Sequence, residues 1–91
     1  MLKFKRIGLD EIGAQTALKD RQWGNLTIIL EDTETDHMRA IELNVMLPKR
    51  PDATMSELEE VARTEGITTL EAALELLRES SLAELAAREE D

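Results

Sequence analysis

Apolar and polar residues alternate along two stretches in the first half of the chain, residues 25–31 and 39–47. The first stretch is the shorter and the more apolar of the two. The alternating apolar positions are Leu26, Ile28 and Leu30 in the first stretch and Ile41, Leu43, Val45 and Leu47 in the second. Because successive side chains of a strand point to opposite faces of a sheet, this period of two predicts two β-strands, each buried on one face.

The connection between the two predicted strands is short. About seven residues separate them, whereas a crossover between parallel strands needs a dozen or more. The strands are therefore expected to be antiparallel, with the sequence EDTETDH at the tip of a β-hairpin. Two strands alone are marginally stable in water. A third strand is expected at the N-terminus, where Leu2 and Phe4 alternate with Lys3 and Lys5.

The segment between the N-terminal strand and the hairpin predicts a helix, from Leu9 to Gln22. Its apolar residues share one helical face, and they are Leu9, Ile12, Ala17 and Leu18. Two glycines, Gly8 and Gly13, oppose this interpretation because glycine is a poor helix former.

The second half of the chain predicts helices. Residues 48–53 are expected to connect the halves, because Pro48 and Pro51 fit neither a central strand nor a helix interior. Three capping boxes follow, in which a hydroxyl and a glutamate three residues later each bond the other's backbone amide. They are Thr54–Glu57, Thr68–Glu71 and Ser81–Glu84. With the apolar spacing, they predict helices over residues 55–65, 69–79 and 82–89, with Gly66 as the C-terminal cap of the first.

A shift in the apolar pattern indicates a bend or break near Ser80 and Ser81. The stripe that includes Leu74 and Leu77 would next need an apolar residue at Ser81, but apolar residues resume one step later, at Leu82. The last segment is either a separate helix or the end of a long one. Residues 1–91 as a whole predict a single α+β domain, with a small antiparallel sheet packed against two to three C-terminal helices.

The net charge of −9 is located entirely in the second half of the chain. Residues 1–50 contain eight basic and eight acidic side chains, whereas residues 51–91 contain three arginines and twelve acids. A field of this sign repels nucleic acid and anionic membranes and attracts basic surfaces. We therefore expect a basic protein surface as the partner, with no direct contact to nucleic acid or membrane.

The N-terminal residues and the lengths of the apolar runs indicate the cellular compartment. The N-terminal residues lack the apolar core of a signal peptide, and no apolar run approaches the roughly 20 residues of a membrane-spanning helix. We expect a cytoplasmic protein.

The acids of EDTETDH match part of a calcium-binding loop. Counted from Asp32, the next two acids, Glu34 and Asp36, occupy positions 3 and 5. Position 6, however, is His37 where such a loop needs glycine, and position 12 is Leu43 where it needs a bidentate glutamate. Aspartate and threonine at a hairpin tip bond to nearby backbone amides, so we favour a solvated turn over a weak divalent-cation site.

Other catalytic and metal-binding chemistry has little support in the composition. The chain has no cysteine, no tyrosine and one histidine, and it lacks a glycine-rich phosphate loop. Its serines lie where helix starts or breaks are expected, so capping accounts for them. We therefore expect no enzymatic activity, no catalytic residue, no cofactor and no metal ligand set.

The one-sided charge of the helical half leads to the functional hypothesis. An ordinary surface helix mixes both signs, and like charges on one helix repel. We therefore expect a non-enzymatic protein-binding domain whose acidic face docks on a basic protein surface, with an unpartnered solvated face as the other interpretation. The candidate partner-binding residues are Glu57, Glu60, Glu71, Glu75, Glu79 and Glu84. By analogy with acidic inhibitors from phages and mobile elements, such a domain would inhibit a nucleic-acid-binding protein, although no motif assigns the chain to such a family.

A second function of a different class is a self-associating structural or assembly module. The last predicted helices carry a surplus of leucine and alanine, and a small sheet has open edges. These features favour a homodimer. The candidate interface residues are Leu76, Leu82 and Leu85.

Overall fold

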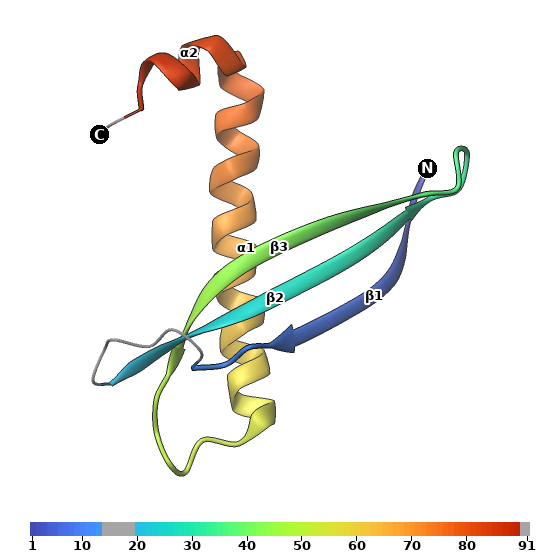
Figure 1. Ribbon diagram of the computed structural model, residues 1–91. Coiled ribbons are helices and arrows are strands. Elements are labelled where there is room, and N and C mark those ends of the chain that lie inside the picture. Colours follow the sequence, from blue (N-terminus) through green and yellow to red (C-terminus); the bar gives the residue numbers. More distant parts are fainter. Residues whose placement is uncertain (14–19, 90–91) are drawn as a thin grey trace.

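The described part of the chain folds into a three-stranded antiparallel sheet and two helices (Figure 1). The computed structural model describes residues 1–13 and 20–89. The strands are β1 (Leu2–Asp10), β2 (Arg21–Asp32) and β3 (His37–Pro48), arranged in the order β1-β2-β3. Helices α1 (Met55–Glu79) and α2 (Leu82–Ala87) follow. The α+β class, the hairpin and the third, N-terminal strand are therefore confirmed.

The register of the sheet places the alternating apolar residues on one face. Leu26 of β2 is paired with Leu9 of β1 and with Leu43 of β3. Ile28 is paired in the same way with Ile7 and Ile41. Because paired residues of antiparallel strands project from the same face, the sheet has one continuous apolar face across all three strands.

A bulge in β1 keeps this face apolar at the N-terminal end. Phe4 is paired with Leu30 and Ile7 with Ile28, so three steps along β1 match two steps along β2. The register shift lies between Phe4 and Arg6, and the extra residue is Lys5. Without it, the even-numbered Phe4 and the odd-numbered Ile7 would project from opposite faces.

Helix α1 is one continuous element of 25 residues, which corrects the prediction of two helices separated at Gly66. Gly66 is a packing residue rather than a cap: a Cβ atom there would lie 3.0 Å from Leu26 Cδ2. The second predicted capping box is absent, because the Thr68 hydroxyl donates to the Thr64 carbonyl oxygen at 3.2 Å, inside the helix. The described residues therefore form one long and one short helix, instead of the three helices predicted over residues 55–65, 69–79 and 82–89.

The other two predicted helix starts are confirmed. The Thr54 hydroxyl accepts from the backbone N–H of Glu57 at 3.1 Å, although the Glu57 carboxylate pairs with Arg50 at 3.0 Å. Ser80 ends α1 in an extended conformation, which confirms the predicted break. Ser81 then starts α2 with a complete capping box.

The predicted helix from Leu9 to Gln22 is wrong for the residues that the structure describes. Leu9 lies in β1 and Gln22 in β2, and residues 14–19 lie outside the described residues. Glu11 and Gly13 have positive φ values of 52° and 79°, so the chain turns there instead of continuing a helix. The connection at residues 48–53 is as expected, except that Pro48 is the last residue of β3.

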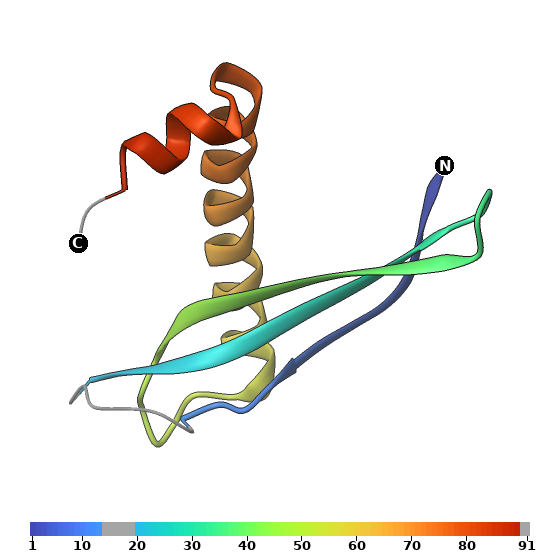
Figure 2. The ribbon, with the colours of Figure 1, turned by 45° about the horizontal axis from the view of Figure 1, so that its top comes forward.

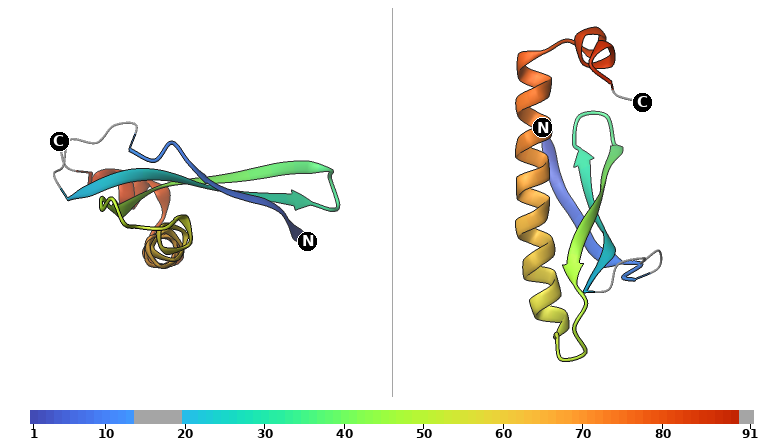
Figure 3. Two further views of the ribbon diagram at one scale, coloured as in Figure 1. Left: turned by 90° about the horizontal axis from the view of Figure 1, so that it is seen from below. Right: turned by 90° about the vertical axis from the view of Figure 1, so that its left-hand side faces the viewer.

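The first half of α1 packs against the end of the sheet that is far from the hairpin tip, mainly on β3 (Figures 1 and 3). The buried core there consists of four hydrophobic residues: Leu26, Val45, Leu47 and Ala62. The helix crosses the strands, so the molecule measures 42 × 37 × 19 Å. The two longer dimensions match strands of about 40 Å and a helix of about 37 Å. Within the described residues, neither helix is long and apolar enough to cross a membrane.

Candidate functional site

The last nine residues of α1, Glu71–Glu79, form a segment that we call the helical arm. Every residue of the arm is exposed, whereas the first half of the same helix holds the buried Ala62 and Gly66. Beyond the crossing point, the arm and the hairpin end of the sheet diverge (Figures 1 and 2). The arm therefore presents all of its sides to solvent.

One side of the arm is an acidic stripe made of Glu71, Glu75 and Glu79. Residues four apart lie on the same face of a helix, about 6 Å apart along its axis. The arm carries a single cation, Arg78. None of the ion pairs found among the described residues involves the three glutamates. The stripe is the part of the predicted acidic surface that has no partner within this part of the chain.

The other three predicted partner-binding acids have local partners. Glu57 pairs with Arg50 at 3.0 Å, and Glu60 pairs with Arg63 at 3.1 Å. Glu84 is the third residue of α2 and closes its capping box, where its Oε1 accepts from the backbone N–H of Ser81 at 3.0 Å. Hydrogen bonds from the Ser81 backbone and hydroxyl lower the pKa of the Glu84 carboxyl group. The structure thus separates the six predicted acids into a stripe of three and three with local roles.

The predicted interface leucines come together where the chain bends between α1 and α2. Leu76, Leu82 and Leu85 line one open hollow, together with Ala86, Arg88 and Glu89. Leu82 is 75% exposed and Leu76 is exposed as well, whereas Leu85 is half-buried. The hollow is open and combines these leucines with charged side chains, so it is compatible with contact to another protein.

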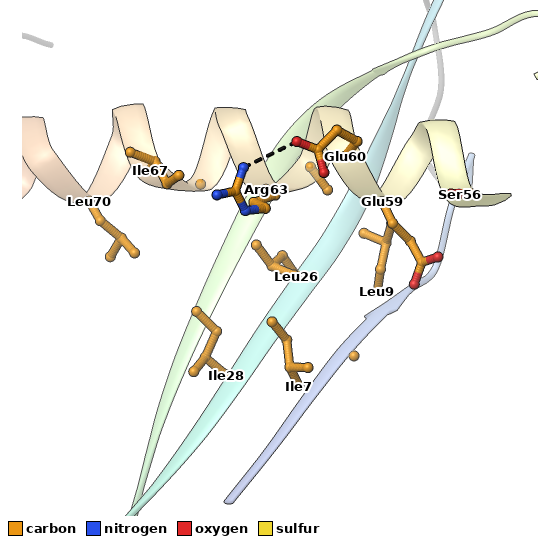
Figure 4. Close-up of a pocket in the computed structure, with 13 residues that line it drawn as sticks. Ile7, Leu9, Leu26, Ile28, Ser56, Glu59, Glu60, Arg63, Ile67 and Leu70 are labelled. Carbon is orange, nitrogen blue, oxygen red and sulfur yellow. Dashed lines mark hydrogen bonds and ion pairs between the residues drawn. The ribbon is translucent and has the colours of Figure 1, made fainter. Parts of the chain in front are cut away.

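Sequence reasoning missed a second apolar feature, a groove of about 480 Å³ between α1 and the sheet (Figure 4). Because α1 packs mainly on β3, it leaves the apolar face of β1 and β2 beside it uncovered. The larger apolar residues that line the groove are Ile7, Leu9, Leu26, Ile28, Ile67 and Leu70. The apolar spacing along α1 was the available signal, but that spacing does not reveal which apolar residues remain uncovered.

The hairpin tip is a turn held by its own hydrogen bonds. Asp32 Oδ1 accepts from the backbone N–H of Glu34 at 3.0 Å, and its Oδ2 accepts from Arg39 at 3.3 Å. The bond from the Glu34 amide, helped by the charge of Arg39, lowers the pKa of the Asp32 carboxyl group. Asp36 takes a positive φ of 58°, which aspartate tolerates in turns. In residues 1–13 and 20–89, no group of three or more histidine, aspartate and glutamate side chains is arranged to hold a metal ion.

Comparison of the chain with models of protein families, with curated proteins and with solved structures finds no match. Functional inference for this chain therefore depends on its own residues and geometry.

Proposed function

We propose that the chain is a non-enzymatic protein-binding module whose helical arm docks on a basic protein surface through the acidic stripe. The observation that carries the proposal is the alignment of Glu71, Glu75 and Glu79 on the helical arm, whose nine residues are all exposed. The concentration of the net negative charge in residues 51–91 supports it, because the long-range field attracts cationic surfaces to the same half of the molecule.

The acidic stripe carries a cost that a basic partner removes. Like charges four residues apart on a helix destabilise it by roughly 0.2–0.5 kcal/mol per pair. Lysine and arginine from a partner would replace that repulsion with attraction. The arm would also bind without first having to fold, because the packed first half of α1 already sets its helical backbone.

A surface that binds nucleic acid is the partner that best complements this stripe. Such surfaces carry closely spaced lysine and arginine residues that neutralise phosphates. A rigid rod with a glutamate at every turn can occupy the same cations. The proposed activity is therefore competitive inhibition of a nucleic-acid-binding protein.

A second candidate function is a self-associating assembly module, and the hollow at the end of α1 favours it. Leu76, Leu82 and Leu85 lie around one opening, and Leu82 extends into solvent. This candidate predicts that replacing Leu82 with aspartate abolishes oligomers, whereas the acidic-docking proposal predicts no effect of that replacement on partner binding.

The acidic-docking proposal is tested with a charge-matched pair of variants. The arm variant carries Glu71→Gln, Glu75→Gln and Glu79→Gln. The control variant carries Glu34→Gln, Glu42→Gln and Glu89→Gln, which removes the same charge from exposed positions outside the arm. Immobilised wild-type protein captures a partner from the native host, and the dissociation constants of the purified partner with all three proteins are then measured over a series of salt concentrations.

The proposal predicts that the arm variant binds roughly tenfold or more weakly than the wild type at low salt, while the control variant stays close to the wild type. It also predicts that wild-type binding weakens steeply as salt rises, because the contact is electrostatic. Equal binding by the arm variant and the wild type, or a flat salt response, would contradict it.

A further inference from the structure

The single chain exposes more surface than a compact protein of its size. Its accessible surface is 7288 Å², whereas a globular monomer of this mass exposes about 5,400 Å². Its radius of gyration is 15.8 Å, against about 12 Å for a compact domain of this length. The excess is about 1,900 Å² per chain. Two chains together would thus have about 3,800 Å² to bury, which lies within the range of obligate homodimer interfaces.

Much of this surface is apolar and lies on the half of the sheet that α1 does not cover. Phe4 is 60% exposed and Ile7 is 56% exposed, although both project from the same face as the core residue Leu26. Their partners on β2, Leu30 and Ile28, are half-buried. We call these four residues the open sheet face. Burying such side chains would stabilise the fold by about 25 cal/mol per Å² of apolar surface.

A leucine stripe on the helix matches the open sheet face in character. Leu70, Leu74 and Leu77 lie at i, i+4 and i+7, which places them on one side of α1. Leu74 is 46% exposed and Leu77 is 59% exposed. The groove between helix and sheet joins the two features, because Ile7 and Ile28 line it from the sheet and Leu70 lines it from the helix (Figure 4).

We propose that a second copy of this chain covers both features, in a two-fold symmetric dimer in which each helical arm lies on the open sheet face of the other protomer. Each protomer has one apolar rod and one apolar surface, and they diverge from each other within the chain (Figures 1 and 2). In a two-fold symmetric dimer both apolar features are covered, because the helical arm of each copy lies on the open sheet face of the other. The leucine stripes continue the apolar grooves across the interface.

The charged side chains near the two features point away from the proposed contact. Lys3 and Arg6 are paired with Glu31 and Ile29, so they project from the sheet face opposite to Phe4 and Ile7. Glu75 and Glu79 lie on the side of the helix away from the leucine stripe, so they stay exposed in the dimer. A second copy can therefore bury both apolar features without removing these charges from water.

This inference is independent of the acidic-docking proposal, and its test measures mass instead of partner binding. Sedimentation equilibrium is run on the full chain from about 1 to 100 µM. The wild type is expected to have twice the 10.3 kDa mass of one chain. The leucine variant, Leu74→Asp/Leu77→Asp, is expected to be monomeric, with a dissociation constant raised roughly a hundredfold or more. The matched control Leu82→Asp replaces another exposed leucine outside both features and is expected to remain dimeric.

A mixing experiment guards against variants that simply fail to fold. The sheet variant Phe4→Asp/Ile7→Asp keeps an intact arm, and the leucine variant keeps an intact open sheet face. Each alone is expected to be monomeric, whereas an equimolar mixture restores one of the two contacts and is expected to form a heterodimer. A wild type that stays monomeric at about 100 µM would overturn the proposal. A Leu82→Asp protein that is monomeric while the leucine variant is still dimeric would also overturn it. So would a mixture of the sheet and leucine variants that forms no heterodimer.

Discussion

Gly66 of α1 lies directly against Leu26 of β2, so closely that a Cβ atom on the glycine would stand 3.0 Å from Leu26 Cδ2. Leu26 is the central residue of the apolar sheet face, and Gly66 is one of the two buried residues of α1. The contact sets where the helix crosses the sheet. It thereby also determines how much of α1 extends beyond the sheet as the helical arm.

Replacing Gly66 with valine is expected to destabilise the protein by about 1–3 kcal/mol, because the added carbons overpack the contact with Leu26. The matched control is Gly8→Val in β1, where an added Cβ would meet no atom within 4 Å. Valine suits a strand, so the control is expected to be neutral or slightly stabilising. Urea unfolding of both variants measures the difference, and equal losses of stability would contradict the proposed contact.

The continuity of α1 predicts opposite effects for two threonines that look alike in the sequence. Thr54→Ala removes the N-cap hydroxyl that accepts from the Glu57 amide and is expected to cost about 1 kcal/mol. Thr68→Ala lies inside the helix and is expected to be neutral or stabilising, since alanine is the better helix former. Thermal unfolding monitored by circular dichroism compares them. A loss at Thr68 as large as that at Thr54 would indicate a second helix start there.

The sequence patterns predicted most elements of the fold, but not how α1 packs on the sheet. Alternation of apolar residues identified β2 and β3, because a half-buried strand requires it. The phase shift at Ser81 located the break between α1 and α2. Gly66, by contrast, has the same local signature whether it caps a helix or permits close packing. Its role depends on Leu26, which is distant in sequence and reaches it only through the tertiary fold.

The candidate site was predictable in its charge but not in its arrangement. Sequence identified Glu71 and Glu57 alike as acids of the helical half. The structure pairs Glu57 with Arg50, seven residues earlier, and leaves Glu71 on the arm. The leucine stripe was missed as a surface for a related reason. An apolar spacing such as that of Leu70 and Leu74 shows that a helix has an apolar side, but not whether its own chain covers that side.

The hairpin tip predicts an acid-sensitive contribution to stability from Asp32. Its pKa in the folded state lies below the ordinary value of 3.8, so the ionised form is favoured by folding. The contribution is therefore present at pH above the unfolded-state pKa and is lost as the pH falls through the folded-state pKa. Asp32→Asn is expected to destabilise the protein at neutral pH, and its difference from the wild type is expected to shrink below about pH 4.

The control for the Asp32 prediction is Asp36→Asn, which removes the same charge from the tip but leaves the bond between Asp32 and the Glu34 amide in place. Asparagine also accepts the positive φ of 58° at that position. The free energies of unfolding of the wild type and the two variants are measured from about pH 2 to about pH 7. A difference between Asp32→Asn and the wild type that does not change with pH would contradict the assignment.

The central claim is that the leucine stripe of the helical arm is an interaction surface that a second copy covers. Amide hydrogen exchange of the wild type and of Leu74→Asp/Leu77→Asp tests it most directly, because the arm and residues 2–6 of β1 diverge within one protomer (Figures 1 and 2). We predict that the substitutions accelerate exchange both in the arm and in residues 2–6, while residues 58–66 stay protected. Unchanged exchange in residues 2–6 would contradict the claim.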